Sequence, residues 1–317
     1  MTTLSKEIKI SGVGFHSGKP VNMVIKPSKK PGIFFSRTDL PDGELIPAKY
    51  DNVGASHLRN TTVGVIGGAH VRTIEHLMAT LYIFGIDSAI IEIDGPETPI
   101  MDGSAKNFCE IFEEKREKRK EKKKKIIIKK EIIARKSEVL KTLPWILRLK
   151  LWLYNLTHKK LTAGGKNDEF VRLSPYAKGL KINARIVYPM PVIGDQSFEF
   201  IFAGGEKART KFIKEIAPTR TFGSLAEWEY LKKRGMAHGA NLENVIVLNK
   251  AGDETLNPLH FADEFVRHKI IDILGDMYTA GGCIIGHVES YKGSHALNNI
   301  LLQKLFSDPS NYDIIEE

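Results

Sequence analysis

The chain has 317 residues, 42% hydrophobic and 9% aromatic, a composition typical of globular proteins with a buried core. Its length accommodates two domains of ordinary size. The opening residues MTTLSKEIKI contain no apolar run, and no stretch reaches the roughly 18 to 20 apolar residues that cross a bilayer. We therefore expect a cytoplasmic protein without a secretory signal or membrane span. Cys109 and Cys283 lack the spacing of disulfide or zinc motifs, so we expect both to be small core residues.

The net charge of +9 is concentrated in one segment. Residues 115–136 hold 13 Lys and Arg against 3 Glu, a local charge of +10, so the rest of the chain sums to −1. Such runs are most often solvated linkers, and we expect no nucleic-acid binding. The sequence predicts domains at 1–115 and 126–317, joined by a basic linker at 116–125. Within the run, the β-branched stretch IIIKKEII predicts the opening strand of the second domain.

The first motifs along the chain are glycine-rich or helical. SGVGFHSG, residues 11 to 18, has the wrong spacing for a nucleotide-binding loop and predicts a strand followed by a tight turn, from which His16 could approach a nucleotide or sugar. TIEHLM then predicts a helix that carries Glu75 and His76 side by side. PETPIMDGSA, residues 96 to 105, is typical of a loop between a strand and a helix.

Residues 137–166 form an apolar and basic insertion. Thr142 is predicted to cap a helix, which would carry its apolar side chains along one face: Trp145, Leu149, Trp152 and Leu156. The helix is too short to span a bilayer. One interpretation is that it covers part of the second domain. The other is a peripheral contact of residues 115–160 with anionic lipid at the inner membrane, because Lys and Arg flank the apolar face.

FVRHKIIDILGDM, residues 265 to 277, predicts a largely buried helix. His268, Asp272 and Asp276 recur at i, i+4 and i+8, which places an imidazole and two carboxylates on one face. A mostly apolar circumference leaves little of the helix for water, and nearly buried polar groups need partners. The pattern alone leaves open a metal site or a structural pair.

A unit of helix, turn and strand occurs twice. It begins at Val71-Arg72 and again at Val266-Arg267, 195 residues later, which suggests a pseudo-symmetric protein with one helix from each half at a shared site. If His76 joins His268 and Asp272, two imidazoles and one carboxylate result, a set that suits zinc with one position open for water. Glu75 would then be placed to take a proton from that water.

The histidine in SYKGSHALNN, His295, follows a Gly-Ser turn. From there its side chain could reach into a cleft. If Asp276 hydrogen-bonds the ring, the imidazole would be held charged and oriented as a proton donor.

Six ordered motifs resemble one family. SGVGFHSG, TIEHLMATL, PETPIMDGSA, TRTFG, DEFVRHKIIDILGD and YKGSHALNN are similar to the UDP-3-O-acyl-N-acetylglucosamine deacetylases, zinc amidases of lipid A synthesis. The resemblance implies an α+β fold of two similar two-layer α/β sandwich domains that face each other across the active site. It implies Zn²⁺ as cofactor, a UDP-linked acylated N-acetylglucosamine as substrate, and a monomer.

The resemblance also implies roles for individual residues. His76, His268 and Asp272 correspond to zinc ligands, Glu75 to the general base, and His295 to the residue that protonates the departing amine. Further positions are implied as follows: Asp276 as partner of His295; Lys269 and Thr221 as groups on the substrate carbonyl; Phe222 as a substrate-binding residue; Leu225, Trp228 and Leu231 after TRTFG as substrate-binding residues beside the acyl chain. The insertion, Ser224 and Ala240 depart from the family pattern.

Two rival functions remain at this level. A zinc hydrolase of the same fold acting on a different acylated amine would keep all the chemical residues. A nucleic-acid-binding or scaffold protein would use the basic run but leave Glu75, His76, His268 and Asp272 without a purpose.

Overall fold

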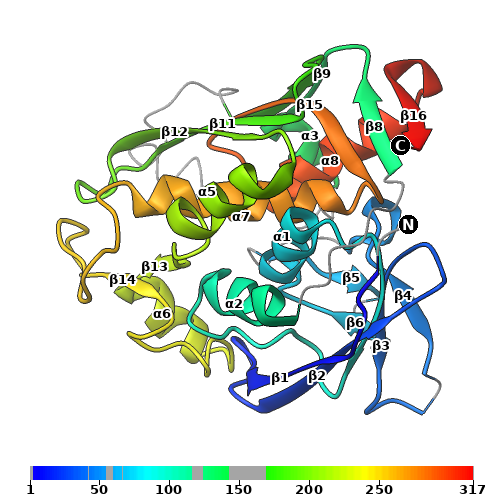
Figure 1. Ribbon diagram of the computed structural model, residues 1–317. Coiled ribbons are helices and arrows are strands. Elements are labelled where there is room, and N and C mark those ends of the chain that lie inside the picture. The colour runs from blue at the N-terminus through cyan, green and yellow to red at the C-terminus, as the bar shows by residue number, and fades with distance from the viewer. Residues whose placement is uncertain are drawn as a thin grey trace.

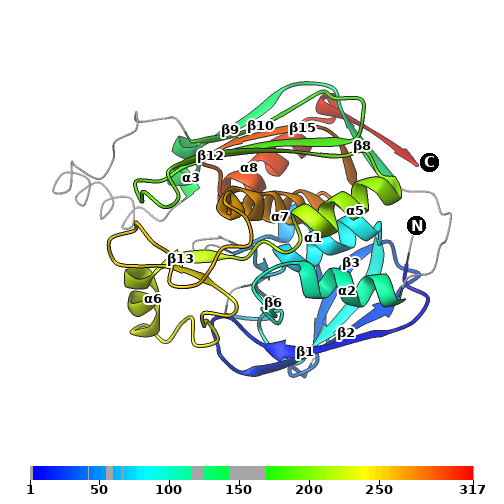
Figure 2. The same cartoon turned by 60° about the vertical axis from the view of Figure 1, so that its left-hand side comes forward.

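The computed structural model describes residues 3–41, 43–54, 60–65, 67–115, 124–142 and 169–316. Two β-sheets form the outer layers of the molecule, and helices fill the space between them (Figure 1). The turned view in Figure 2 shows the layers edge-on, with α1 and α7 at their centre. The predicted α+β class is confirmed.

The first sheet is built from residues of the first third of the chain. Its five strands are ordered β1-β2-β7-β3-β4, and β7 at the centre runs antiparallel to β2 and parallel to β3. Their bounds are β1 (Ile8–Val13), β2 (Pro20–Pro27), β3 (Gly32–Arg37), β4 (Leu45–Pro47) and β7 (Ser88–Ile93). A short separate ladder joins β5 (Val63–Gly64) and β6 (His70–Val71).

The second sheet has seven strands, and its central part follows the order β12-β11-β15-β10-β9. Here β15 is parallel to β11 and antiparallel to β10, and its first residues run parallel to β8, which pairs in turn with β16. The bounds are β8 (Lys124–Ile128), β9 (Ile132–Arg135), β10 (Phe170–Ser174), β11 (Leu180–Val187), β12 (Asp195–Phe202), β15 (Cys283–Tyr291) and β16 (Tyr312–Glu316).

The helices lie mainly between the sheets. Their bounds are α1 (Glu75–Phe84), α2 (Lys106–Lys115), α3 (Lys136–Thr142), α5 (Gly205–Glu215), α6 (Leu225–Lys232), α7 (Glu264–Tyr278) and α8 (His295–Phe306), with 3-10 turns η1 (Tyr50–Asn52) and η2 (Pro309–Asn311). A smaller unit beside the sandwich pairs β13 (Phe222–Ser224) with β14 (Ile246–Leu248) next to α6.

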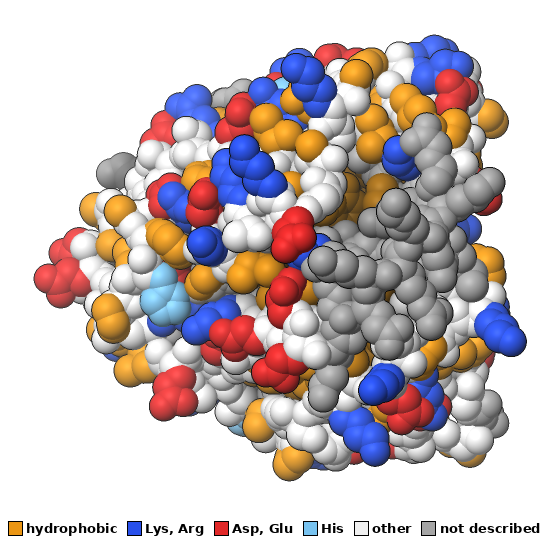
Figure 3. Space-filling model, in the orientation of Figure 1, with side chains coloured by type: hydrophobic (Ala, Val, Ile, Leu, Met, Phe, Trp, Pro, Cys, Tyr) orange, Lys and Arg blue, Asp and Glu red, His pale blue; other side chains and the backbone are white. Residues whose placement is uncertain are grey.

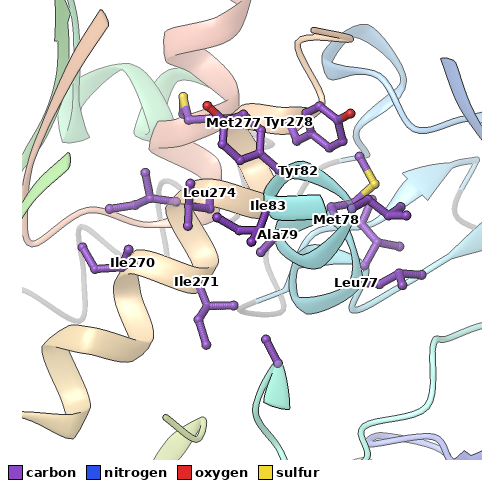
Figure 4. Close-up of a cluster of buried hydrophobic side chains, with 14 of the residues drawn as sticks. Leu77, Met78, Ala79, Tyr82, Ile83, Ile270, Ile271, Leu274, Met277 and Tyr278 are labelled. Carbon is purple, nitrogen blue, oxygen red and sulfur yellow. The ribbon is translucent and has the colours of Figure 1, made fainter. Parts of the chain in front are cut away.

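Helix α1 packs against α7, and together they form the centre of the core. Alanine, leucine and methionine favour the α1 helix, which ends where Gly85 adopts a left-handed conformation at φ 69°. Figure 4 shows buried apolar side chains around both helices: Leu77, Met78, Ala79, Tyr82, Ile83, Ile270, Ile271, Leu274, Met277 and Tyr278. Both helices are buried around most of their circumference, as predicted for α7.

The repeated unit of helix, turn and strand is visible in both halves. α1 leads to β7 and α7 leads to β15. β7 lies between antiparallel β2 and parallel β3, and β15 lies between antiparallel β10 and parallel β11, with its first residues also parallel to β8. The strand and turn predicted for SGVGFHSG and the loop predicted for PETPIMDGSA are also present. The domain boundaries at 1–115 and 126–317 stay predictions.

One local prediction is wrong. IIIKKEII forms the end of β8 and the start of β9 rather than one strand, because β8 pairs with β15 and β16 whereas β9 pairs with β10. Thr142 is the last residue of α3, and the helix predicted to follow it lies outside the described residues. Residues 116–123 of the basic linker lie outside the described residues. So do residues 143–168, which include most of the insertion.

The surface has no single charge character on the face shown in Figure 3. There, described Lys and Arg side chains alternate with Asp and Glu, and hydrophobic side chains lie between them. Within the described ranges, none of the helices is long and apolar enough to cross a bilayer.

Gly275 permits the close approach of α7 to α1 and provides a test of it. A Cβ atom at this position would lie 2.0 Å from the carbonyl oxygen of Glu75. We expect Gly275→Ala to lower the free energy of unfolding by about 1–3 kcal/mol, because steric overlap outweighs the gain in helix propensity. Chemical denaturation measures this. Gly68→Ala, with its nearest new contact at 3.6 Å, is the matched control. A Gly275→Ala protein as stable as the parent would contradict the packing.

Candidate metal centre and active site

The first turn of α1 and the middle of α7 bring three metal-ligating side chains together. His76 comes from α1, and His268 and Asp272 lie one turn apart on α7. One ligand atom from each lies within 4.8 Å of the others, and all three residues are buried. The imidazole rings of His76 and His268 are nearly perpendicular, with centroids 5.0 Å apart. Distant segments of the sequence therefore form one donor set, as the sequence predicted.

The protonation states of these groups suit a cation. Burial and the neighbouring His268 lower the pKa of His76 to about 3, and burial also lowers the pKa of His268. Although burial opposes ionisation of Asp272, Lys269 and His268 lower the pKa of this carboxyl below its ordinary value. At neutral pH the cluster thus offers two neutral imidazoles and one carboxylate, the forms that bind a divalent metal.

Hydrogen bonds fix the orientation of the cluster. His268 Nδ1 lies 3.0 Å from the carbonyl oxygen of Thr219, which directs Nε2 toward His76 and Asp272. Lys269 Nζ donates to Asp272 Oδ2 at 2.7 Å. These contacts are typical of the outer partners of metal ligands, and the residues present fit a metal ion.

A buried ion pair supports the TRTFG segment behind the cluster. Glu264, which has no exposed surface, accepts from the backbone N–H of Arg220 at 3.0 Å and from its Nε at 3.1 Å. The next residue, Thr221, donates its N–H to the carbonyl of Gly103 at 2.9 Å. The Arg220–Glu264 pair thereby fixes the residues on either side of Arg220: Thr219, whose carbonyl orients His268, and Thr221.

Glu75 lies beside the donor set at the start of α1. Its Oε2 accepts from the backbone N–H of Thr61 at 3.0 Å. Burial raises the pKa of Glu75 to about 7, against the opposing effect of charged His295. A carboxyl with this pKa can accept a proton near neutral pH.

His295 and Asp276 form a second buried pair next to the cluster. His295 Nδ1 lies 2.8 Å from Asp276 Oδ2, and Asn298 Nδ2 donates to the same oxygen at 2.7 Å. Although burial lowers the pKa of a histidine, the Asp276 carboxylate outweighs this effect and raises the pKa of His295 to about 10. His295 is therefore a cation at neutral pH, and its Nε2 lies 4.0 Å from Asp272 Oδ2.

A cavity of about 810 Å³ opens over the cluster. Its wall includes these predicted site residues: His16, Glu75, His76, Thr221, Phe222, Trp228, Leu231, His268, Lys269, Asp272 and His295. His16 is 7% exposed, its Nε2 lies 3.2 Å from Asn60 Nδ2, and its Nδ1 has no hydrogen-bond partner among the described atoms. Phe222 packs on the ligand helix, with its ring 5.0 Å from that of Phe265.

Part of the cavity wall is apolar. A separate cluster of Ala237, Ala240, Val245 and Val247 packs against Phe15, Leu225, Trp228 and Leu231. Leu225 packs against this cluster, and its place beside a substrate stays a prediction. Ser224 accepts from the N–H of Glu227 at 3.2 Å and caps α6, which turns the next residue, Leu225, into the helix.

Three positions near the site escaped the sequence patterns. Thr61 and Asn298 both donate to Asp276, and Glu264 supports Arg220. Asn298 follows His295 at i+3 on α8, a spacing that could have indicated a shared face. Thr61 has no such signal, because it is 215 residues from Asp276 in the sequence.

Comparison with known proteins places the chain. The family model LpxC, described as UDP-3-O-acyl N-acetylglycosamine deacetylase, matches residues 1–307. The chain belongs to this deacetylase family. Its members are enzymes that hydrolyse an amide bond, and the resemblance noted in the six motifs is confirmed.

Curated relatives span nearly the whole chain. The UDP-3-O-acyl-N-acetylglucosamine deacetylase of Myxococcus xanthus is 39% identical over 99% of this chain and 88% of its own length. Proteins of the same name from Nitratiruptor sp. and Neisseria meningitidis serogroup A are 36% and 37% identical, each over 99% of this chain and 93% and 92% of their lengths.

Loss of the ligand on α1, or of one of the ligands on α7, should abolish tight metal binding. We expect His76→Ala and Asp272→Ala each to weaken zinc affinity by more than the roughly 10- to 100-fold seen for loss of an outer partner. Competition with a chromophoric chelator measures the affinity. His238→Ala changes an exposed histidine and serves as the control. Unchanged zinc affinity in the His76→Ala protein would rule out this metal centre.

Proposed function

We propose that the chain hydrolyses the N-acetyl group of UDP-3-O-(3-hydroxyacyl)-N-acetylglucosamine and gives acetate and a free amine, the committed step of lipid A biosynthesis. The observation that supports this most directly is the buried set of His76, His268 and Asp272 in a member of the deacetylase family, with Glu75 beside it on the same cavity. The names of the relatives supply the substrate class.

Zinc is the metal that we propose for the centre. Two imidazoles and one carboxylate are a ligand set of catalytic zinc sites, which keep a further position open. When bound, the ion supplies Lewis acidity for hydrolysis of the amide. His76 and His268 would each bind through a ring nitrogen, and Asp272 through a carboxylate oxygen.

Glu75 is proposed as the general base. Its carboxylate takes a proton from the water that attacks the acetyl carbon. Thr61 donates to Oε2, which holds the carboxylate in place beside the cluster. Its raised pKa of about 7 matches the demand on a base that works near neutral pH.

His295 is proposed as the general acid. Its charged ring releases a proton from Nε2 to the departing amine nitrogen, because Nδ1 is engaged by Asp276. A glucosamine nitrogen is a poor leaving group as an anion, so this proton is needed for the C–N bond to break. Asp276 fixes the ring and stabilises its charged form.

Lys269 and Thr221 are proposed to stabilise the negative charge that develops on the acetyl oxygen. Both line the cavity, and Lys269 brings a cation next to Asp272. Preorganised donors at this position act more strongly in the transition state than on the neutral amide. His16 and Phe222 would contact the sugar or nucleotide, and Trp228 and Leu231 the acyl chain, with Leu225 supporting them from behind.

A second candidate function keeps the same chemistry on a different acylated amino sugar. The apolar wall that would receive the acyl chain contains Ala240 and lies next to Ser224, two departures from the family pattern. Both residues adjoin the apolar wall and not the donor set, so they bear on the substrate and leave the hydrolytic groups unchanged.

The first test is release of free amine from UDP-3-O-(3-hydroxyacyl)-N-acetylglucosamine over a series of acyl lengths, with metal content determined on the same sample. We expect activity that requires about one zinc ion per chain, as three protein ligands bind one ion. A zinc-loaded protein that is inactive on every acyl length, but active on another acylated amino sugar, would favour the second candidate.

The pH dependence reports the proposed base and acid. Glu75 acts when deprotonated, so kcat/KM should rise as pH increases through the pKa of Glu75. This pKa is about 7 in the metal-free site, and a bound cation lowers it because the cation favours the carboxylate. His295 acts when protonated, so kcat/KM should fall as pH increases through about 10. Glu75→Gln should lower kcat by at least about 100-fold and His295→Gln should remove the alkaline limb. A profile of Glu75→Gln identical to that of the parent would refute the role of the base.

We also propose that the protein is a cytoplasmic monomer that contacts the inner membrane peripherally through residues 115–160. The support is sequence alone: a basic run followed by Trp and Leu at helical spacing, in an enzyme whose substrate carries an acyl chain. Sedimentation with anionic vesicles should capture the intact chain more than a variant lacking residues 143–166. Equal sedimentation of the two proteins would refute the contact.

A further inference from the structure

Thr61 contacts both the proposed base and the pair that contains the proposed acid through two different hydrogen bonds. Its backbone N–H donates to Glu75 Oε2 at 3.0 Å, and its hydroxyl donates to Asp276 Oδ1. The same hydroxyl oxygen lies 3.2 Å from His295 Nδ1. The residue is 3% exposed, so none of these contacts competes with bulk water. One residue of the first half thus touches the proposed base and the pair that contains the proposed acid.

The surroundings of Asp276 show what the hydroxyl contributes. Oδ2 is engaged by His295 Nδ1 at 2.8 Å and by Asn298 Nδ2 at 2.7 Å, whereas Thr61 engages Oδ1. Donors on both oxygens fix the plane of the carboxylate, and this plane determines where the His295 ring can lie. Without the hydroxyl, Oδ1 loses a buried donor and the carboxylate can rotate about its Cβ–Cγ bond.

The backbone of Thr61 is held in turn by the start of α1. The N–H of Ile74 donates to the Thr61 carbonyl at 3.4 Å, next to the bond from Thr61 to Glu75. The position of the hydroxyl is therefore set by the helix that carries Glu75 and His76, while its acceptor belongs to α7. The hydrogen bond from the Thr61 hydroxyl to Asp276 therefore depends on the distance between α1 and α7.

We propose that Thr61 is a positioning residue that aligns the His295–Asp276 pair with Glu75 across the two halves of the protein. The inference rests on the proposed function, because it assigns Thr61 to the proton transfers of that reaction. Thr61 acts through Asp276 and His295 and does not line the substrate cavity. Its hydroxyl should therefore affect the rate of the chemical step more than substrate binding.

The test compares Thr61→Val, which removes the hydroxyl at nearly constant volume, with Thr61→Ser, which retains it. We expect Thr61→Val to lower kcat by about 10- to 100-fold with little change in KM, as for other outer partners of catalytic groups. Thr61→Ser should restore most of kcat. Ser88→Ala is the matched control, because it removes a buried hydroxyl that bonds the Ser28 and Lys30 carbonyls away from the site.

A double-mutant cycle separates positioning from general destabilisation. Thr61→Val should add little to the loss caused by His295→Gln, since both act through the same proton transfer. Fully additive losses, a Thr61→Ser protein as impaired as Thr61→Val, or a Thr61→Val protein no more impaired than Ser88→Ala would each overturn the proposal.

A spectroscopic readout keeps this inference distinct from the proposed function. In the zinc-loaded protein with ¹⁵N-labelled histidines, the Nδ1 proton of His295 is assigned by its loss in His295→Gln. Thr61→Val should shift this resonance and speed its exchange with water, and Thr61→Ser should not. Wild-type protein inactive on all acyl lengths would refute the substrate but leave this readout intact. An unshifted resonance in Thr61→Val would overturn the role of Thr61.

Discussion

Helices α1 and α7 cross where Gly275 leaves no side chain between them, and the backbone of Glu75 packs into that space. This contact places the first turn of α1 beside the middle of α7, so that His76 meets His268 and Asp272. The apolar side chains around the crossing hold both helices at a fixed distance (Figure 4). A displacement of either helix would move one imidazole away from the other two ligands. The metal centre is thus a consequence of how the core packs.

Burial of so many ionisable groups is unfavourable by itself, and the arrangement compensates it in three ways. The imidazoles of His76 and His268 are kept neutral, Asp272 has a cationic neighbour in Lys269, and His295 forms an ion pair with Asp276. A bound cation would balance the remaining negative charge. Burial raises the pKa of the Glu75 carboxyl to about 7, whereas the Asp276 carboxylate, against the effect of burial, raises the pKa of the His295 imidazole to about 10. The surroundings of each group, and not its residue type alone, thus set the pKa values that suit Glu75 as base and His295 as acid.

The family pattern accounts for much of the site but not for all of it. The spacing of His268, Asp272 and Asp276 on one helix face follows from the helical repeat, and all three lie at the site. Leu225, whose type and spacing suit an acyl passage, packs against the apolar cluster that contains Ala240, and its role beside the acyl chain stays a prediction. The direction of a side chain at an irregular segment depends on tertiary contacts, here the cap that Ser224 provides to α6.

The sequence by itself indicated the helices that carry the candidate ligands, because helical periodicity is a local property of the chain. The order of six motifs indicated the family, and the resemblance to that family implied the α+β class. The sequence also indicated that β-branched residues open the second half, but not that they divide into β8 and β9, since strand partners are distant in sequence. Only the tertiary structure decided the contacts of Thr61 with Glu75 and Asp276 and the pairing of Arg220 with Glu264. Such contacts join residues tens to hundreds of positions apart, and their physical basis is the packing of the helices.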